Sequence, residues 1–380
     1  MRIKATGVAL GLAFATIASW APASVAQYVR TDLASNVKGA APSTDQQHLI
    51  NSWGLTALAA TPFWLSDNGS GFSTLYTGAG QQIPLFVSIP PSPNSGSGSL
   101  GTPTGTVGNI SPNATDFVVT ENGKSAKSFF IFATLDGTIS AWSPAVDGIV
   151  PDPTTHTSTS HATIMADRSK EGSTYTGLAI AANEKGEFFL FATDGGPNRA
   201  VDIFNSNFQY VRSFRDERIP QSFTTYGIQA IDGKLWVTYT PLGNGHGGFV
   251  DVFNADGTVH RHNALHGPLD SPWGIAVAPK DFGPKSGMIL VSNNAPNGRI
   301  LAFDKDGEFR GFLRDAKHKA IVIDNIWAMQ FGQDGGPNGA HNQLFFTGGP
   351  NNYGDGIFGM ITFDGKTGDG DDDSDDHNDD

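Results

Sequence analysis

The strongest constraint on the fold is a sequence pattern that recurs along the chain with a period near 50 residues. Its clearest copy runs from 271 to 307, where an aromatic residue and a glycine open three short apolar runs separated by turn residues. The glycines that open three successive copies, Gly177, Gly227 and Gly274, are 50 and 47 residues apart. Short apolar runs between turn residues predict antiparallel strands. Four-stranded units at this spacing are typical of propeller blades.

Six copies of the pattern predict an all-β fold, a six-bladed β-propeller of four-stranded antiparallel blades. The last copy contains only three strands, whereas Tyr28–Ser35 alternates apolar and polar residues and has no local partner. We therefore expect the N-terminal strand to complete the sixth blade and close the ring. With no cysteine in the chain, this closure cannot be helped by a disulfide.

The second copy is the least regular. Its three inner strands are predicted at Phe117–Thr120, Ser128–Thr134 and Gly137–Pro144, with the fourth at His161–Met165. The preceding stretch, Pro90–Gly105, is rich in Pro, Ser and Gly and is expected to form an irregular loop.

Innermost strands crowd the axis of a propeller, so they need small residues. We assign this role to four glycines: Gly54, Gly177, Gly227 and Gly274. The aromatic residues beside them in the copies are expected to wedge between blades. These are Trp53, Tyr226, Trp273 and Trp327.

The two ends differ in composition from the repeats. Residues 1–26 combine a positive start, a short apolar run and small residues before Gln27, as in a secretion signal. Residues 27–366 are assigned to the propeller, and 367–380 to a disordered acidic tail. The chain is therefore expected to be exported, to the periplasm or the medium, and to have no membrane span once the signal is removed.

The net charge of −13 includes eight aspartates in the last twelve residues, but the remainder is acidic as well. An acidic surface repels phosphate backbones. We expect no nucleic-acid partner. The partners compatible with the sequence are a small molecule, a glycan or a protein.

Several long motifs resemble those of a bacterial family of exported proteins. They include Asn51-Ser-Trp-Gly-Leu, Gly233-Lys-Leu-Trp-Val-Thr-Tyr and Pro268-Leu-Asp-Ser-Pro-Trp-Gly-Ile-Ala. That family is similar to six-bladed propellers of the NHL and TolB-like kind and has no established activity to transfer. Where it is expected to read Tyr-Lys-Gly-Leu-Ala, this chain has Thr176 in place of the lysine. More distant six-bladed relatives include gluconolactonase-type and paraoxonase-type hydrolases, which hold a divalent metal on the axis.

Two sets of loops of a propeller open on one face around the axis: those before each innermost strand and those after each second strand. Oxygen ligands converging there could hold Ca²⁺ or another divalent cation, with one carboxylate or His161 acting as base. Asn, Asp and Gly are also what turns require, so the same residues need no ligand. The candidates for this axial face are Asn51, Asp67, Asn68, His161, Asp194, Asp270, Asn293, Asn294 and Asp324.

Two function classes stay open from the sequence. The first is a binding module that uses the axial face. The second is a divalent-metal-dependent hydrolase of lactones or esters. There is no Gly-x-Ser-x-Gly motif to indicate a serine hydrolase. Other histidines, among them His246, His266 and His341, lack metal-binding spacing and are interpreted as surface or loop residues.

Overall fold

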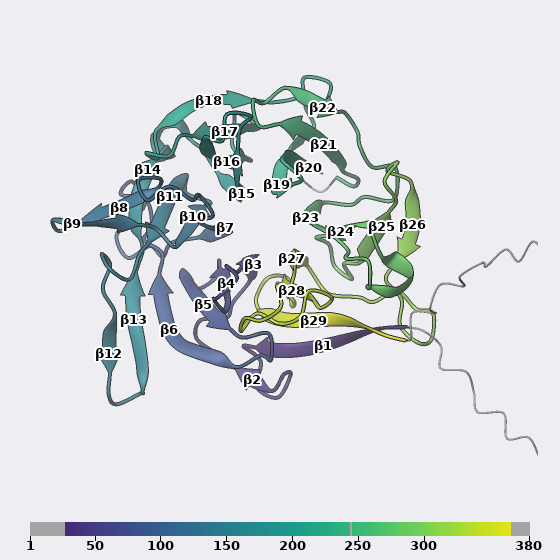
Figure 1. Ribbon diagram of the computed structural model, residues 1–380, viewed down its shortest axis with the longest axis horizontal. Coiled ribbons are helices and arrows are strands. Elements are labelled where there is room, and N and C mark those ends of the chain that lie inside the picture. The colour runs from purple at the N-terminus through teal and green to yellow at the C-terminus, as the bar shows by residue number, and fades with distance from the viewer. Residues whose placement is uncertain (1–26, 244, 366–380) are drawn as a thin grey trace, which may run out of the picture.

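The computed structural model of the chain describes residues 27–243 and 245–365. Six antiparallel sheets surround a central axis in this part (Figure 1), which confirms the six-bladed β-propeller. Its only helices are two single 3₁₀ turns, η1 (Ser169–Glu171) and η2 (Gly283–Lys285). The segments assigned to a signal (1–26) and an acidic tail (367–380) lie outside the described residues.

Blades 1, 3, 4 and 5 each take four consecutive strands, numbered outward from the axis. Blade 1 consists of β3 (Ser52–Thr56), β4 (Phe63–Asp67), β5 (Phe72–Tyr76) and β6 (Gln82–Ser88). Blade 3 consists of β15 (Tyr175–Ala182), β16 (Phe188–Asp194), β17 (Ala200–Phe204) and β18 (Tyr210–Phe214). Blade 4 consists of β19 (Phe223–Ile231), β20 (Lys234–Pro241), β21 (Phe249–Asn254) and β22 (Val259–Arg261). Blade 5 consists of β23 (Pro272–Val277), β24 (Ile289–Asn293), β25 (Ile300–Phe303) and β26 (Phe309–Phe312).

Blade 6 closes the ring with strands from both ends of the chain, as the sequence predicts. It consists of β27 (Ile326–Phe331), β28 (Leu344–Gly348), β29 (Ile357–Asp364) and β1 (Gln27–Ser35), with the short β2 (Ser43–Thr44) at its edge. β1 pairs antiparallel with β29 from Gln27↔Asp364 to Ser35↔Ile357. Figure 1 shows the two strands side by side.

Blade 2 differs from the prediction at its innermost strand. It consists of β7 (Pro103–Gly108), β10 (Phe130–Thr134), β11 (Thr138–Trp142) and β14 (Thr163–Asp167). The prediction that 117–120 is the inner strand is wrong, and so is the assignment of 103–105 to a loop. β7 is almost free of large apolar residues because it lies at the crowded axis, so its hydrophobic pattern is weak.

The crowding at the axis is visible at the glycines of the innermost strands. A Cβ on Gly227 would lie 2.1 Å from the carbonyl oxygen of Trp273, and one on Gly105 would lie 2.2 Å from the amide nitrogen of Leu178. Gly54, Gly177 and Gly274 meet the next blade in the same way. The innermost strands of blades 1 to 5 therefore approach the next blade backbone to backbone, as expected from the glycine positions.

Blade 2 carries two insertions. The hairpin β8 (Val118–Glu121) and β9 (Lys124–Lys127) follows β7, and β12 (Val150–Asp152) and β13 (Thr157–His161) follow β11. β13 pairs parallel with β6, so the insertion extends blade 1 to six strands. The apolar residues that suggested an inner strand, Phe117 and Val119, are buried instead in the core that blade 2 shares with blade 3.

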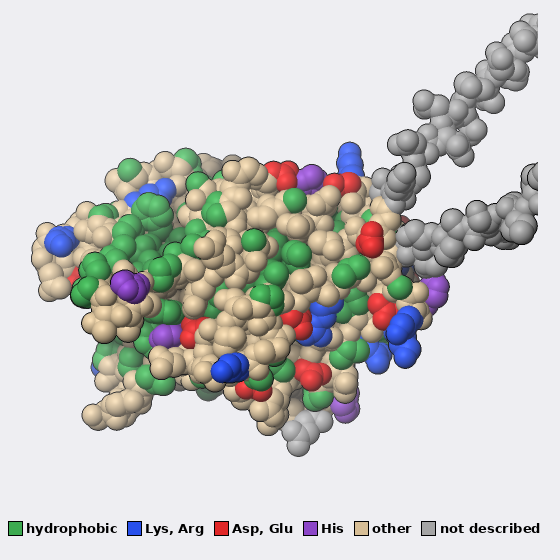
Figure 2. Space-filling model, turned by 90° about the horizontal axis from the view of Figure 1, so that it is seen from below, with side chains coloured by type: hydrophobic (Ala, Val, Ile, Leu, Met, Phe, Trp, Pro, Cys, Tyr) green, Lys and Arg blue, Asp and Glu red, His purple; other side chains and the backbone are tan. Residues whose placement is uncertain are grey.

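Seen from the side, Lys and Arg are scattered over the surface and several lie beside Asp or Glu (Figure 2). Apolar side chains are most frequent on the side where Figure 1 places the insertions. None of the helices in the described residues has the length and apolar character needed to span a bilayer.

Candidate functional site

The axis is closed on the face where the innermost strands begin, which we call the start face. Aromatic rings from four blades meet there instead of wedging between blades as predicted. Trp53 stacks on Trp327 with ring centroids 3.6 Å apart, and Trp273 lies edge-on to both at 6.4 and 5.8 Å. Tyr226 and Tyr353 each lie 5.7 Å from Trp327. We call these five residues the aromatic plug.

Two of the predicted site residues hold the plug in place. The Oδ1 atom of Asn51 accepts a hydrogen bond from the indole of Trp327 at 3.1 Å. The Oδ1 atom of Asn294 accepts from the hydroxyls of Tyr226 and Tyr353, both at 3.1 Å. These amide oxygens already have partners, so their role is to order the rings.

The predicted carboxylates do not converge on the axis. Both oxygens of Asp67 accept hydroxyl groups of its own blade, from Ser52 at 2.5 Å and Thr74 at 2.7 Å. Complete burial raises the pKa of Asp67 to about 7. The Oδ1 atom of Asp194 accepts the amides of Thr174 and Gly196, each at 2.8 Å. Each of these carboxylates therefore accepts hydrogen bonds from strands and turns of its own blade, which is a structural role.

Two further candidates are paired with the backbone of neighbouring blades. Asp324 accepts the amide of Asn297 at 3.0 Å, and Asn68 donates to the carbonyl of Pro103 at 3.2 Å. Aromatic rings therefore fill this end of the axis, and the candidate oxygens are directed to different partners rather than to one common point, as a cation site would require. This arrangement does not fit the Ca²⁺ or other divalent ion that the sequence left open for this axis, and it agrees with the alternative that these are turn residues.

His161 lies apart from the other candidates. It is the last residue of β13, which pairs with β6, the outermost regular strand of blade 1. Its Nε2 atom is 2.9 Å from a carboxylate oxygen of Glu121. The expectation that it joins the axial set is not met, because an insertion carries it to the rim.

On the opposite face the axis opens into a recess of about 260 Å³. Its walls are aliphatic residues and uncharged polar ones, including Thr56, Gln229 and Gln330, and none of the lining residues is ionisable. A smaller cavity of about 30 Å³ continues inward to Trp273 of the plug. The recess is therefore closed at its inner end by the aromatic plug.

A larger pocket of about 550 Å³ lies off the axis on the start face, between loops of blades 4 and 5. It contains two of the sequence-predicted residues, Asp270 and Asn293, together with His246 and Arg299. We call it the blade-5 pocket. The sequence did not indicate that His246 is part of this site, because it lies in a loop of blade 4. It is 24 residues from Asp270 in the chain, and only the folded arrangement of the two loops brings the two side chains together.

The polar groups of the blade-5 pocket carry both signs of charge. The Nδ1 atom of His246 is 3.3 Å from one oxygen of Asp270, whose other oxygen accepts the amide of Gly247 at 3.1 Å. Arg299 lies over the ring of Phe312 at 5.4 Å and forms no ion pair with the described residues. Asn293 donates to the carbonyl of Pro268 at 2.9 Å and so fixes the loop that bears Asp270.

A cluster of ionisable side chains with shifted pKa values lies farther out, between blades 3 and 4. His262 is 2.9 Å from Asp216 and 3.2 Å from Asp251. Burial raises the pKa of Asp251 to about 6. Burial also opposes ionisation of Asp216, but hydrogen bonds from Arg218 outweigh it and hold the pKa of Asp216 at about 2. Opposite charges are matched here, as in a structural ion-pair network.

No family model matches the chain. It is similar to two uncharacterized proteins of Acanthamoeba polyphaga mimivirus. One is 29% identical over 87% of this chain and 78% of the relative, and the other is 26% identical over 73% and 72%. A gluconolactonase from Xanthomonas campestris covers 84% of this chain and 88% of its own at 12% identity, with a TM-score of 0.49. A streptogramin B lyase covers 90% and 100% at 12% identity, with a TM-score of 0.48. These similarities assign no activity to this chain.

Proposed function

We propose that the protein is a ligand-binding module and that its ligand occupies the blade-5 pocket. The observation that carries this proposal is a 550 Å³ pocket into which two blades direct His246, Asp270 and Arg299. A concave site of this size with a few convergent polar groups is the usual form of a small-molecule site. The recess on the axis is smaller and has no charged group to orient a ligand.

The charges in the pocket define the ligand class. Arg299 has no acidic partner among the described residues, so its guanidinium is free to bind a carboxylate in two-point contact. The Asp270–His246 pair can bind hydroxyl groups. The ligand that suits both is a hydroxylated organic acid, such as an acidic sugar or the acidic unit of a glycan.

Thermal melting of the purified chain with gluconate and glucuronate, each compared with glucose, tests this proposal. Binding to the folded state raises the melting temperature. We expect a rise with the acids, loss of the rise in Arg299→Ala, and retention in Arg212→Ala, an exposed arginine of blade 3. Equal responses to acid and neutral sugar, or an unchanged response in Arg299→Ala, would contradict it.

Hydrolysis of esters or lactones in the same pocket is a second candidate. It is favoured by the His246–Asp270 pair, in which the carboxylate orients the imidazole and leaves Nε2 as a possible base. The test is hydrolysis of gluconolactone and p-nitrophenyl acetate, with and without chelator. Loss of activity in His246→Ala but not in His266→Ala supports it, and activity that survives both substitutions refutes it.

Export is proposed as well, on the composition of residues 1–26. Expression of the full chain in a bacterial host, followed by sequencing of the mature N-terminus, should locate cleavage before Gln27. Retention of Met1 in cytoplasmic protein would refute export.

A further inference from the structure

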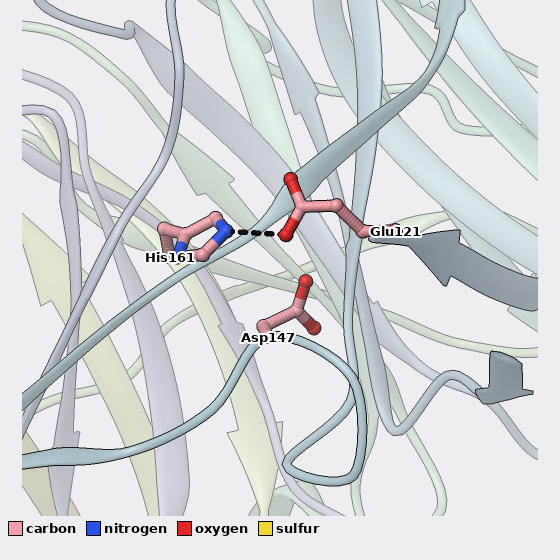
Figure 3. A group of neighbouring side chains, drawn as sticks. All are labelled: Glu121, Asp147 and His161. Carbon is pink, nitrogen blue, oxygen red and sulfur yellow. Dashed lines mark hydrogen bonds and ion pairs between the residues drawn. The ribbon is translucent and has the colours of Figure 1, made fainter. Parts of the chain in front are cut away.

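Three metal-ligating side chains meet at the rim of the propeller, away from the blade-5 pocket. Glu121 comes from β8, Asp147 from the loop after β11, and His161 from the end of β13. Figure 3 shows the three side chains directed toward one space. One donor atom of each lies within 4.8 Å of the others.

Asp147 is held rigidly in this group. Its side chain is buried, its Oδ2 atom accepts the amide of Ser143 at 2.6 Å, and its Oδ1 atom accepts the hydroxyl of Thr163 at 2.7 Å. Metal-binding carboxylates are commonly oriented by such outer hydrogen bonds. Each oxygen keeps a lone pair for a ligand.

The group lacks positive charge. Glu121 pairs with His161 at 2.9 Å, and neither Glu121 nor Asp147 forms an ion pair with a Lys or Arg of the described residues. The other three-residue group, around Asp216, differs because Arg218 neutralises it.

A buried hydroxyl group next to the carboxylate of Asp147 has no partner in the described part of the chain. Ser143 is 1% exposed, and its hydroxyl has no hydrogen-bond partner among the described residues. Its amide contacts Asp147, so the hydroxyl is only a few ångströms from the proposed ligand. A metal ion with bound water would supply a partner at this position.

We propose that Glu121, Asp147 and His161 bind one divalent transition-metal ion of the zinc class. Imidazole nitrogen with carboxylate oxygens suits Zn²⁺, whereas Ca²⁺ takes oxygen ligands. Metal–ligand bonds of about 2.0–2.2 Å place tetrahedral donor atoms about 3.4 Å apart. The 2.9 Å between His161 and Glu121 must therefore open slightly, and donor atoms of the group that now lie up to 4.8 Å apart must move closer. Three protein ligands leave a coordination position for water.

The ion would join the two insertions of blade 2 to each other at the loop that follows β11. The β8–β9 hairpin forms a sheet of its own, and β13 belongs to the sheet of blade 1, whereas Asp147 belongs to blade 2. Binding should therefore link the insertions to the ring and raise thermal stability. The proposal does not depend on the ligand of the blade-5 pocket.

Zn²⁺ titration of the full chain by calorimetry, after chelator treatment, tests the site. The acidic tail is present in every variant, so only differences between variants count. We expect one tight site per chain, weakened at least about tenfold in Asp147→Asn and in His161→Ala, and by about tenfold in the positioning variant Thr163→Val. The matched control is His266→Ala, which removes a histidine paired with Glu308 at 3.1 Å but with no third ligand.

Melting curves without metal check that each variant folds, and melting with Zn²⁺ gives a second measurement. The wild type and His266→Ala should be stabilised by the ion, and the ligand variants should not. Zinc binding of equal strength in all variants, or the absence of a tight site in the wild type, would overturn the proposal.

Discussion

Trp53 of blade 1 stacks on Trp327 of blade 6, with ring centroids 3.6 Å apart and planes at 19°. The two indoles join the first and last copies of the repeat at the axis. They also explain why the axis holds no open site on the start face.

The plug should contribute strongly to stability. Trp327 is buried and its indole donates to Asn51, so Trp327→Ala leaves a large cavity and an unpaired amide oxygen. We expect a loss of about 3–5 kcal/mol in the free energy of unfolding. Urea denaturation measures this loss, and Leu242→Ala, at an exposed position, should change stability by less than about 0.5 kcal/mol.

Ring closure should depend on the hydroxyl of Tyr28. It donates to the carbonyl of Phe282 at 2.7 Å and accepts the amide of Lys285 at 2.9 Å, so it ties β1 to blade 5. Tyr28→Phe leaves both backbone groups without this partner and should cost about 1–3 kcal/mol. Tyr210→Phe, at an exposed tyrosine, is the control. Equal unfolding midpoints for the two variants would show that this tie does not stabilise the ring.

Close approach of the innermost strands predicts a severe effect at Gly105. A Cβ there would lie 2.2 Å from the backbone of Leu178, and the backbone cannot move aside without displacing blade 3. Gly105→Ala should cost at least about 3 kcal/mol, at the upper end of overpacking effects. Gly123→Ala is the comparison, because its Cβ meets open space and only its positive φ of 78° is strained, at a cost of about 1 kcal/mol. Thermal melting of both variants decides the ranking.

Asp67 should make stability depend on pH. The folded protein keeps its proton to a pKa of about 7, whereas the unfolded chain releases it near pH 4. The folded state binds more protons between these values, so this group's contribution to stability falls as pH rises from about 4 to about 7.

Asp67→Asn removes this titration. The unfolding free energy of the variant should exceed that of the wild type by an amount that grows with pH over this range, to at most about 4 kcal/mol above pH 7. Asp232→Asn, at an exposed turn, should leave the profile unchanged. A constant difference between Asp67→Asn and the wild type across pH 4–8 would exclude the raised pKa.

Much of the fold could be predicted because blades are built from local patterns. Alternating strands, turn residues and the glycines beside the aromatics define the number of blades, and the unpaired strand at Tyr28 indicates how the ring closes. The inner strand of blade 2 was missed for a physical reason. Its position is set by packing at the axis, where small residues replace the large apolar ones that mark a strand elsewhere.

The candidate sites were less predictable. The sequence places Asp270 and Asn293 on one face by repeat position alone, but it cannot show that His246 joins them, since that contact depends on the course of a loop from another blade. It also cannot show that His161 is carried to the rim by an insertion. The sequence by itself determined a closed ring of six blades. Only the tertiary structure decided that aromatic rings fill its axis and that polar groups gather off it, because side chains from distant blades meet only after the ring has closed.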